Sequence, residues 1–143
     1  MRKLYKIKSV GSKGKGVFAI REIKKDKLIM TRDYSRLKRY KAGDKRLGKS
    51  NHVDYIGKGE YVIDNSPSSY INHSCNPNTK IVIVSKNKAK IYAIKNIKKG
   101  KELTYNYSKS KKELAKAKKE GIYVWKMKCK CGSNKCEKII RGF

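Results

Sequence analysis

The sequence predicts a mainly β domain of short strands, with one late helix and a cysteine-rich tail. Short apolar runs rich in β-branched residues, such as 17–20 and 81–84, are bounded by glycine, lysine, asparagine and aspartate, which is typical of strands joined by turns. Only the stretch at about 109–120 has the lysine-, glutamate-, alanine- and leucine-rich composition of a helix. At 143 residues, the chain is expected to fold as one domain with a modest core.

The first 31 residues are expected to form short strands separated by turns. An apolar run at 17–20 follows a glycine-rich turn at 11–16. The segment FAIREIKKDK at 18–27 resembles YAIKNIKKGK at 92–101. Two copies are too few for a solenoid, so we interpret the similarity as two β-turn-β units of the same design.

The middle of the chain, residues 32–60, is polar and weakly patterned, and we interpret it as a variable insert. Further strands are predicted at 61–64, at 81–84 as a buried strand, and at 90–94. The helix has Ser108 or Ser110 as its candidate N-cap and Gly121 as its end.

The charge of the chain is strongly positive, since 39 lysines and arginines against 11 acidic residues give a net charge of +28. Such a charge suits a polyanionic partner, whether DNA, RNA or an anionic membrane surface. The alternative, a lysine-coated protein without such a partner, stays open. No apolar run approaches the roughly 18 residues of a membrane span, and no apolar segment follows the basic start. We therefore expect an intracellular protein without a signal peptide.

The four cysteines fit a structural zinc site. Cys129, Cys131 and Cys136 form a C-x-C-x4-C pattern, and Cys75 is the fourth. Zinc takes four thiolates tetrahedrally in structural sites, and the surrounding lysines favour the thiolate form. The alternatives are inert buried cysteines or two disulfides, and a reducing compartment disfavours the disulfides.

Three polar motifs are candidates for a ligand site: GKG at 14–16, NHSCNPN at 72–78 and ELTYNY at 102–107. Glycines let a ligand approach the backbone closely, but GKG is not a dinucleotide fingerprint, because a third glycine and a βαβ pattern are missing. Asn72 and His73 could orient a polar ligand, whereas His52 has no such company and is expected at the surface.

Tyr105 and Tyr107 are two residues apart, so on a strand they face the same side. They either line one pocket or form a pair of core aromatics.

Together these motifs resemble the SET-domain protein-lysine methyltransferases, and the resemblance covers nearly the whole chain outside 32–60. It implies the SET fold, in which ELTYNY passes beneath a loop near NHSC in a knot-like arrangement. It also implies a catalytic domain at 1–107, with 32–60 as its variable insert. The remainder, 108–143, would hold the helix and a post-SET segment whose cysteines share one zinc with Cys75.

The resemblance implies S-adenosylmethionine as methyl donor, S-adenosylhomocysteine as product, and a target lysine that enters through a narrow channel. Tyr107 matches the catalytic tyrosine, with Tyr105 beside it. The implied cofactor-binding residues are Gly14, Lys15, Gly16, Asn72, His73, Tyr107 and Phe143. The implied channel residues are Tyr70, Tyr105 and Trp125. The implied zinc ligands are Cys75, Cys129, Cys131 and Cys136.

The implied reaction is mainly monomethylation of lysine, because tyrosine at position 105 tends to limit the channel to fewer methyl groups. A dry aromatic channel would also disfavour the ammonium form of the lysine, whose free pKa is about 10.4. The expected substrate is a basic protein, such as a histone or another DNA-associated protein, in the nucleus, nucleoid or cytoplasm. The alternative function is a basic, zinc-containing nucleic-acid-binding module that keeps the fold without methyl transfer.

The sequence departs from the pattern of the family at several places, including Asn106 in place of a frequent aspartate and the segment 137–142 after the last cysteine. Ser69 stands where many relatives have an arginine near the cofactor, and TRDY at 31–34 occupies the place of a common acidic stretch.

Overall fold

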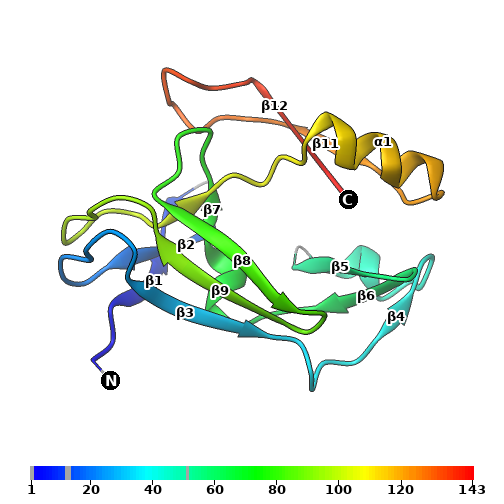
Figure 1. The fold of residues 1–143 in the computed structure, drawn as a ribbon, viewed down its shortest axis with the longest axis horizontal. Helices are drawn as coiled ribbons and strands as arrows, with labels where there is room; N and C mark the ends of the chain where they lie inside the picture. The colour runs from blue at the N-terminus through cyan, green and yellow to red at the C-terminus, as the bar shows by residue number, and fades with distance from the viewer. Residues whose placement is uncertain (1, 12–13, 51) are drawn as a thin grey trace.

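The fold is built from several small sheets, and the mainly β prediction is confirmed (Figure 1). The computed structural model describes residues 2–11, 14–50 and 52–143. Ser12 and Lys13, which belong to the predicted glycine-rich turn, lie outside the described residues, as does Asn51 of the insert.

The first half of the chain forms a hairpin and contributes to two three-stranded sheets. β1 (Tyr5–Ser9) pairs antiparallel with β2 (Lys15–Ala19). One three-stranded sheet has the order β3-β9-β8, from β3 (Leu28–Asp33), β9 (Lys88–Ala93) and β8 (Thr79–Ser85). The other has the order β4-β6-β5, from β4 (Tyr40–Lys41), β6 (Glu60–Ile63) and β5 (Val53–Gly57). The predicted insert therefore contributes β4 and β5 to a small sheet, whose central strand β6 corresponds to the strand predicted at 61–64.

The two predicted β-turn-β units are brought together across the core. Ile23 and Ile97, which hold equivalent places in the two units, form a β-bridge and exchange backbone hydrogen bonds of 2.8 Å in both directions. Both side chains are buried. They belong to the hydrophobic core, whose buried members are Val17, Ala19, Ile23, Ile29, Met30, Ile71, Ile91, Ala93, Ile97 and Leu103.

The strand predicted at 81–84 is present, but the prediction that it is buried is wrong. Ile83 is 73% exposed and Val84 is 55% exposed. β8 is an edge strand of its sheet, and only its first half, around Thr79 and Ile81, packs against the core. A short, continuous run of β-branched apolar residues does not by itself distinguish an edge strand from a central one.

The C-terminal segment forms a layer of its own. α1 (Lys111–Lys119) begins two residues after its predicted start, because Ser110 is the N-cap. The Ser110 side chain accepts from the Glu113 amide at 3.1 Å, and the Glu113 carboxylate accepts from the Ser110 amide at 3.1 Å, which is a complete capping box. Among the described residues no helix has the length and apolar character needed to span a membrane.

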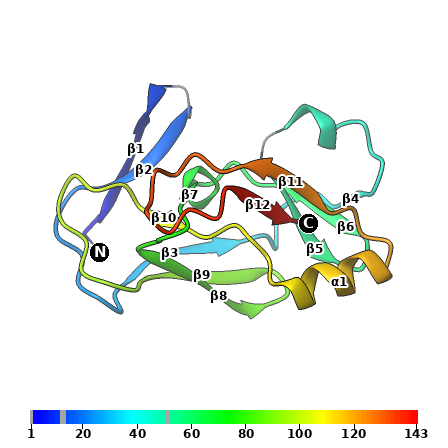
Figure 2. The same cartoon turned by 90° about the horizontal axis from the view of Figure 1, so that it is seen from above.

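After the helix, β11 (Trp125–Lys128) pairs antiparallel with β12 (Ile139–Gly142). In Figure 1 this orange and red segment lies above the sheets, with α1 beside it. Viewed from above, it crosses the middle of the molecule, between the β1–β2 hairpin at one end and the β4–β6 sheet at the other (Figure 2). The tail is thus placed over the centre of the fold, where the site lies.

Candidate functional site

Two short strands that are distant in the sequence form the centre of the site. β7 (Asn72–His73) pairs in parallel with β10 (Thr104–Tyr105), so that Thr104 lies opposite Asn72 and Tyr105 opposite His73. The Ser74 amide donates to the Tyr105 carbonyl at 3.0 Å and extends the contact. The NHSCNPN and ELTYNY stretches therefore lie side by side, as the sequence analysis expected.

Asn78 fastens these two stretches together with both ends of its amide. Its Nδ2 donates to the Glu102 carbonyl at 2.8 Å, and its Oδ1 accepts from the Thr104 amide at 2.9 Å. The neighbouring Thr79 hydroxyl donates to the Thr104 carbonyl at 2.7 Å. An asparagine suits this position because it offers a donor and an acceptor on one short side chain.

The GKG stretch reaches the same place from the N-terminal hairpin. The Asn72 Nδ2 donates to the Lys15 carbonyl at 3.1 Å and to Glu102 Oε2 at 2.7 Å. A Cβ atom at Gly16 would lie 2.6 Å from Glu102 Oε2 and 3.1 Å from Asn72 Nδ2. A side chain at position 16 would therefore displace the Glu102 carboxylate from this approach. At Gly14 the reason differs, since its φ of 81° lies in the left-handed region.

Tyr107 is held at the centre by its own hydroxyl and by its backbone. Its hydroxyl donates to the carbonyl of the buried Ile71, and its amide donates to His73 Nδ1 at 2.9 Å. The Tyr105 ring lies 4.6 Å from the Tyr107 ring, measured between centroids. Burial raises the pKa of both phenols above the ordinary value. Both hydroxyls are therefore neutral at physiological pH.

His73 connects Tyr107 to the cysteine cluster. Since Nδ1 accepts from the Tyr107 amide, the proton of the neutral ring must reside on Nε2. Nε2 lies 3.3 Å from Cys75 Sγ and can donate to it. Burial lowers the pKa of His73, which keeps the ring neutral. A change at the cysteines can thus affect the position of Tyr107 through the His73 side chain.

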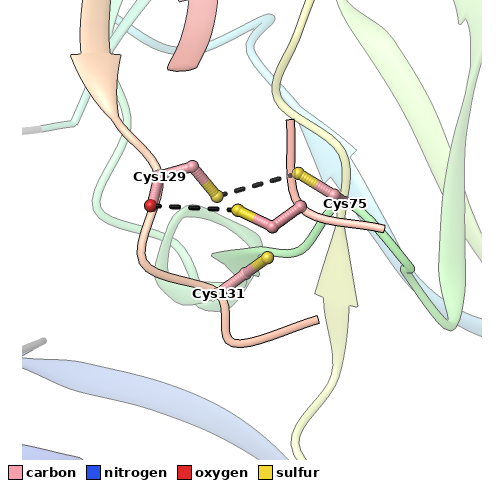
Figure 3. A group of neighbouring side chains, drawn as sticks. Cys75, Cys129 and Cys131 are labelled. Carbon is pink, nitrogen blue, oxygen red and sulfur yellow. Dashed lines mark hydrogen bonds between the residues drawn. The ribbon is translucent and has the colours of Figure 1, made fainter. Parts of the chain in front are cut away.

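The four cysteines meet, although Cys75 is more than 50 residues from the others in the sequence. Their four sulfur atoms all lie within 4.8 Å of one another, and the Cys75 and Cys129 sulfurs are 3.7 Å apart. Figure 3 shows the side chains of Cys75, Cys129 and Cys131 converging from the loop after β7 and from the tail. All four are free thiols, so the disulfide alternative is not what the structure has.

This donor set fits a tetrahedral zinc ion. Four thiolates at about 2.3 Å from zinc would have sulfur atoms about 3.8 Å apart, which agrees with the Cys75–Cys129 distance of 3.7 Å. The backbone amides of Glu137 and Lys138 donate to the sulfurs of Cys75 and Cys136 at 3.3 and 3.4 Å. Such donors stabilise thiolate charge.

A buried cation that the sequence analysis missed lies beside Tyr105. The Arg32 Nε donates to Ser68 Oγ at 2.9 Å, its terminal nitrogen donates to the Ser68 carbonyl at 3.3 Å, and Asp64 lies 3.9 Å away. Arg32 is only 8% exposed. Burial raises the pKa of Tyr105, and the nearby Arg32 guanidinium opposes this increase. The sequence signal for Arg32 was the TRDY stretch at 31–34, which the sequence analysis interpreted only as a departure from the pattern of the family.

Tyr70, predicted to lie near the channel, is in contact with two other residues singled out in the sequence. The Lys15 ammonium lies 5.7 Å from the Tyr70 ring centroid, and the His52 ring lies 4.8 Å from it in an edge-to-face arrangement. His52 was expected at the surface; it is only partly exposed, and its ring has Tyr70 as an aromatic neighbour. It is half-buried because β5 follows it and returns the chain to β6 beside Tyr70.

The two aromatic residues predicted for the tail have different surroundings. The Phe143 ring lies 6.1 Å from the Tyr55 ring of the insert, and the Lys109 ammonium lies 5.1 Å from its centroid. Trp125 packs against Gly142, where a Cβ atom would lie 2.4 Å from the indole ring. Trp125 therefore stabilises the pairing of β11 with β12, while Phe143 contacts the insert. Their predicted roles toward cofactor and substrate stay predictions.

Comparison with known proteins points to one family. A family model described as the SET domain matches residues 14–108. The variant-silencing SET domain-containing protein of Plasmodium falciparum is 34% identical over 118 residues, which cover 71% of this chain and 5% of that protein. The H3 lysine-9 specific histone-lysine N-methyltransferase KMT1 of Fusarium mangiferae is 34% identical over 105 residues, which cover 68% of this chain and 28% of that protein.

A solved structure gives the same result. The crystal structure of a candidate histone methyltransferase from Plasmodium falciparum is 26% identical to this chain and superposes with a TM-score of 0.57. The match covers 78% of this chain and 98% of that structure. The chain spans less than a third of the length of the curated relatives named above.

Proposed function

This chain belongs to the SET-domain family, and from that premise we propose that it is an S-adenosylmethionine-dependent protein-lysine N-methyltransferase. The observation that carries the proposal is the position of Tyr107. Its neutral hydroxyl donates to the Ile71 carbonyl, its ring lies against Tyr105, and its amide is bonded to His73 in the motif expected to bind the cofactor.

The chemistry fits these side chains. When bound, the cofactor supplies an electrophilic sulfonium methyl group. In the transfer, the lysine Nζ lone pair would form the new N–C bond as the S–C bond breaks, and a neutral thioether would leave, so the chain need not supply an acid. Because the Tyr107 proton is engaged by Ile71, the phenol oxygen presents lone pairs that can hold the methyl hydrogens or the amine. Catalysis is then mainly alignment of the two reactants.

The buried charge of Arg32 supports the same reaction. The lysine must lose its proton before it attacks, and a nearby cation disfavours the ammonium form. Arg32 is fixed by Ser68 and lies next to Tyr105. The expelled proton leaves to solvent before transfer, since the raised pKa of both tyrosines leaves neither phenol ready to accept it.

The degree of methylation is expected to depend on Tyr105. We expect Tyr105→Phe to shift the product from mainly monomethyllysine toward di- and trimethyllysine, because loss of the hydroxyl makes room beside the amine. Mass spectrometry of a methylated peptide after exhaustive reaction measures the distribution. Tyr123→Phe, at a tyrosine that is 76% exposed, is the matched control. An unchanged distribution in the Tyr105 variant would contradict the assignment.

The substrate class proposed is a basic protein that accompanies nucleic acid, such as a histone, inside the cell. The name of the Fusarium mangiferae relative supports a histone substrate. The charge of +28 opposes direct approach of a lysine-rich peptide unless a polyanion neutralises it. Nucleic acid bound to both proteins would satisfy this requirement.

One surface of the chain supports nucleic-acid contact. A groove of about 510 Å³ lies between α1 and β12. The cations that line it are Lys109, Lys111, Lys118 and Arg141, with Glu137 as the one acidic residue. Within the described ranges, none of these four cations takes part in an ion pair. Unpaired cations along a groove suit phosphate groups.

Nucleic-acid binding at this groove should depend steeply on salt. If four cations contact phosphates, affinity for duplex DNA should fall roughly a hundredfold between 50 and 200 mM salt. Lys111→Gln with Lys118→Gln should lower the affinity and flatten the salt dependence. Lys25→Gln with Lys99→Gln, at exposed turns, is the control. Fluorescence anisotropy measures both, and equal behaviour of the two double variants would contradict a role for the groove.

The experiment that tests the proposed function is transfer of labelled methyl from S-adenosylmethionine to histones and other DNA-associated proteins, together with calorimetry of cofactor binding. We expect label on lysine side chains and one cofactor bound per chain. A folded, zinc-loaded protein that binds DNA but neither binds the cofactor nor transfers methyl would support the nucleic-acid-binding alternative instead.

A further inference from the structure

Glu102 is an acidic residue at the meeting point of the three stretches that form the site. Its Oε2 accepts from Asn72 Nδ2 at 2.7 Å. Its backbone forms a β-bridge with Phe18, in the strand that carries GKG. The carboxylate is also the nearest group to the space in front of Gly16, where a Cβ atom would lie 2.6 Å from Oε2. No cofactor or substrate role was predicted for this residue.

The carboxylate has no cationic partner among the described residues. The ion pairs there engage five other acidic residues, namely Glu22, Asp33, Asp44, Glu60 and Asp64. In a chain with 39 lysines and arginines, a half-buried carboxylate without a cation is unexpected. The described hydrogen bond uses only Oε2. Oε1 is therefore able to accept from a bound group.

The surrounding groups select a positively charged nitrogen. The Lys15 carbonyl lies 3.1 Å from the same Asn72 Nδ2 that bonds to Glu102. Because Nδ2 donates to two acceptors, the orientation of the Asn72 amide is determined, and its Oδ1 must face away from both. The Glu102 carboxylate and the Lys15 carbonyl are thus two acceptors that share the Asn72 amide as donor, and both favour a donor with positive charge.

We propose that Glu102 binds the α-ammonium group of the methionine moiety of the cofactor. The absence of a side chain at Gly16 leaves room for the Glu102 carboxylate to reach this ammonium group. The inference rests on the proposed function for the identity of the ligand. A carboxylate bonded to an ammonium forms a charge-assisted hydrogen bond, which is about twice as strong as a neutral one. Glu102 therefore distinguishes ligands that carry the α-amino group from ligands that lack it.

A purely structural role for Glu102 makes a different prediction. If its only task were to hold Asn72, then Glu102→Gln would be nearly silent, since the glutamine oxygen also accepts from Nδ2 at the same length. If it binds an ammonium, the same variant keeps the packing but loses the charge. The comparison therefore needs two ligands that differ only in the α-amino group.

The test is calorimetry with S-adenosylhomocysteine and with its analogue in which hydrogen replaces the α-amino group. We expect Glu102→Gln to weaken S-adenosylhomocysteine binding on the order of tenfold or more and to leave analogue binding unchanged. Glu22→Gln, at an exposed carboxylate paired with Lys24, should change neither affinity. Thermal unfolding of each variant verifies the fold.

Three results would decide against the inference. Equal affinity of wild type and Glu102→Gln for S-adenosylhomocysteine overturns it while leaving the proposed function intact. An equal loss for both ligands assigns Glu102 to the structure of the pocket and also overturns it. If the folded wild type binds neither ligand, the proposed function and this inference fail together.

Discussion

Tyr107→Phe is expected to lower the rate of methyl transfer at least about a hundredfold, with little change in cofactor affinity. This substitution removes only the hydroxyl. That hydroxyl donates to the Ile71 carbonyl, and its oxygen presents lone pairs to the reacting centre. Misplacing reactants by about 1 Å costs on the order of a hundredfold. Single-turnover transfer of labelled methyl to a peptide measures the chemical step directly.

The control for this experiment must separate chemistry from folding. The Tyr107 backbone bond to His73 Nδ1 survives in phenylalanine, so calorimetry should still detect the cofactor. Removal of one buried hydroxyl also leaves the Ile71 carbonyl without that donor, which is expected to cost about 1–3 kcal/mol of stability. Tyr123→Phe should leave both rate and stability unchanged. A Tyr107 variant with the full rate would exclude the proposed role.

Loss of the metal is expected to release the C-terminal layer from the rest of the fold. Structural zinc sites contribute on the order of 10 kcal/mol to the structure that they hold, and Cys75 is the one member of the four candidate ligands that lies outside the tail. We expect one zinc per chain in the wild type and none bound stably in Cys75→Ser. Hydrogen exchange should then become fast at 125–142, while the core strands β3 and β9 stay protected.

The zinc site is also expected to affect catalysis. Without the Cys75 sulfur, His73 Nε2 loses the partner 3.3 Å away, and the ring that accepts from the Tyr107 amide is less well held. Cys75→Ser should therefore lower the transfer rate at least tenfold even when cofactor is saturating. Met127→Ser, at an exposed residue of the same tail, is the control. Retained zinc stoichiometry and protected tail amides in Cys75→Ser would contradict the assignment of the fourth ligand.

Several features were predictable from the sequence because their cause is local. Ser110 and Glu113 are three residues apart, and a capping box needs only that spacing. The C-x-C-x4-C spacing places three sulfurs within reach of one ion without any knowledge of the fold. Tyr105 and Tyr107 share a side of an extended segment for the same kind of reason, and their rings do lie 4.6 Å apart.

The errors arose where the outcome depends on distant neighbours. Residues 81–84 have the composition of a buried strand, yet Ile83 and Val84 are exposed because they lie in the second half of the edge strand β8, away from the core. Arg32 was overlooked because a buried arginine needs partners such as Ser68 and Asp64, which are more than 30 residues away.

By itself the sequence determined the mainly β class, the capped helix, the three polar motifs and the four cysteines of the candidate zinc site, because composition, short spacings and residue type identify each of them. Only the tertiary structure decided that β7 and β10 pair in parallel, that Glu102 lies against Gly16, and that His73 connects Cys75 to Tyr107. These contacts join segments separated by tens of residues. Their free energy comes from burying one common core, which no local pattern encodes.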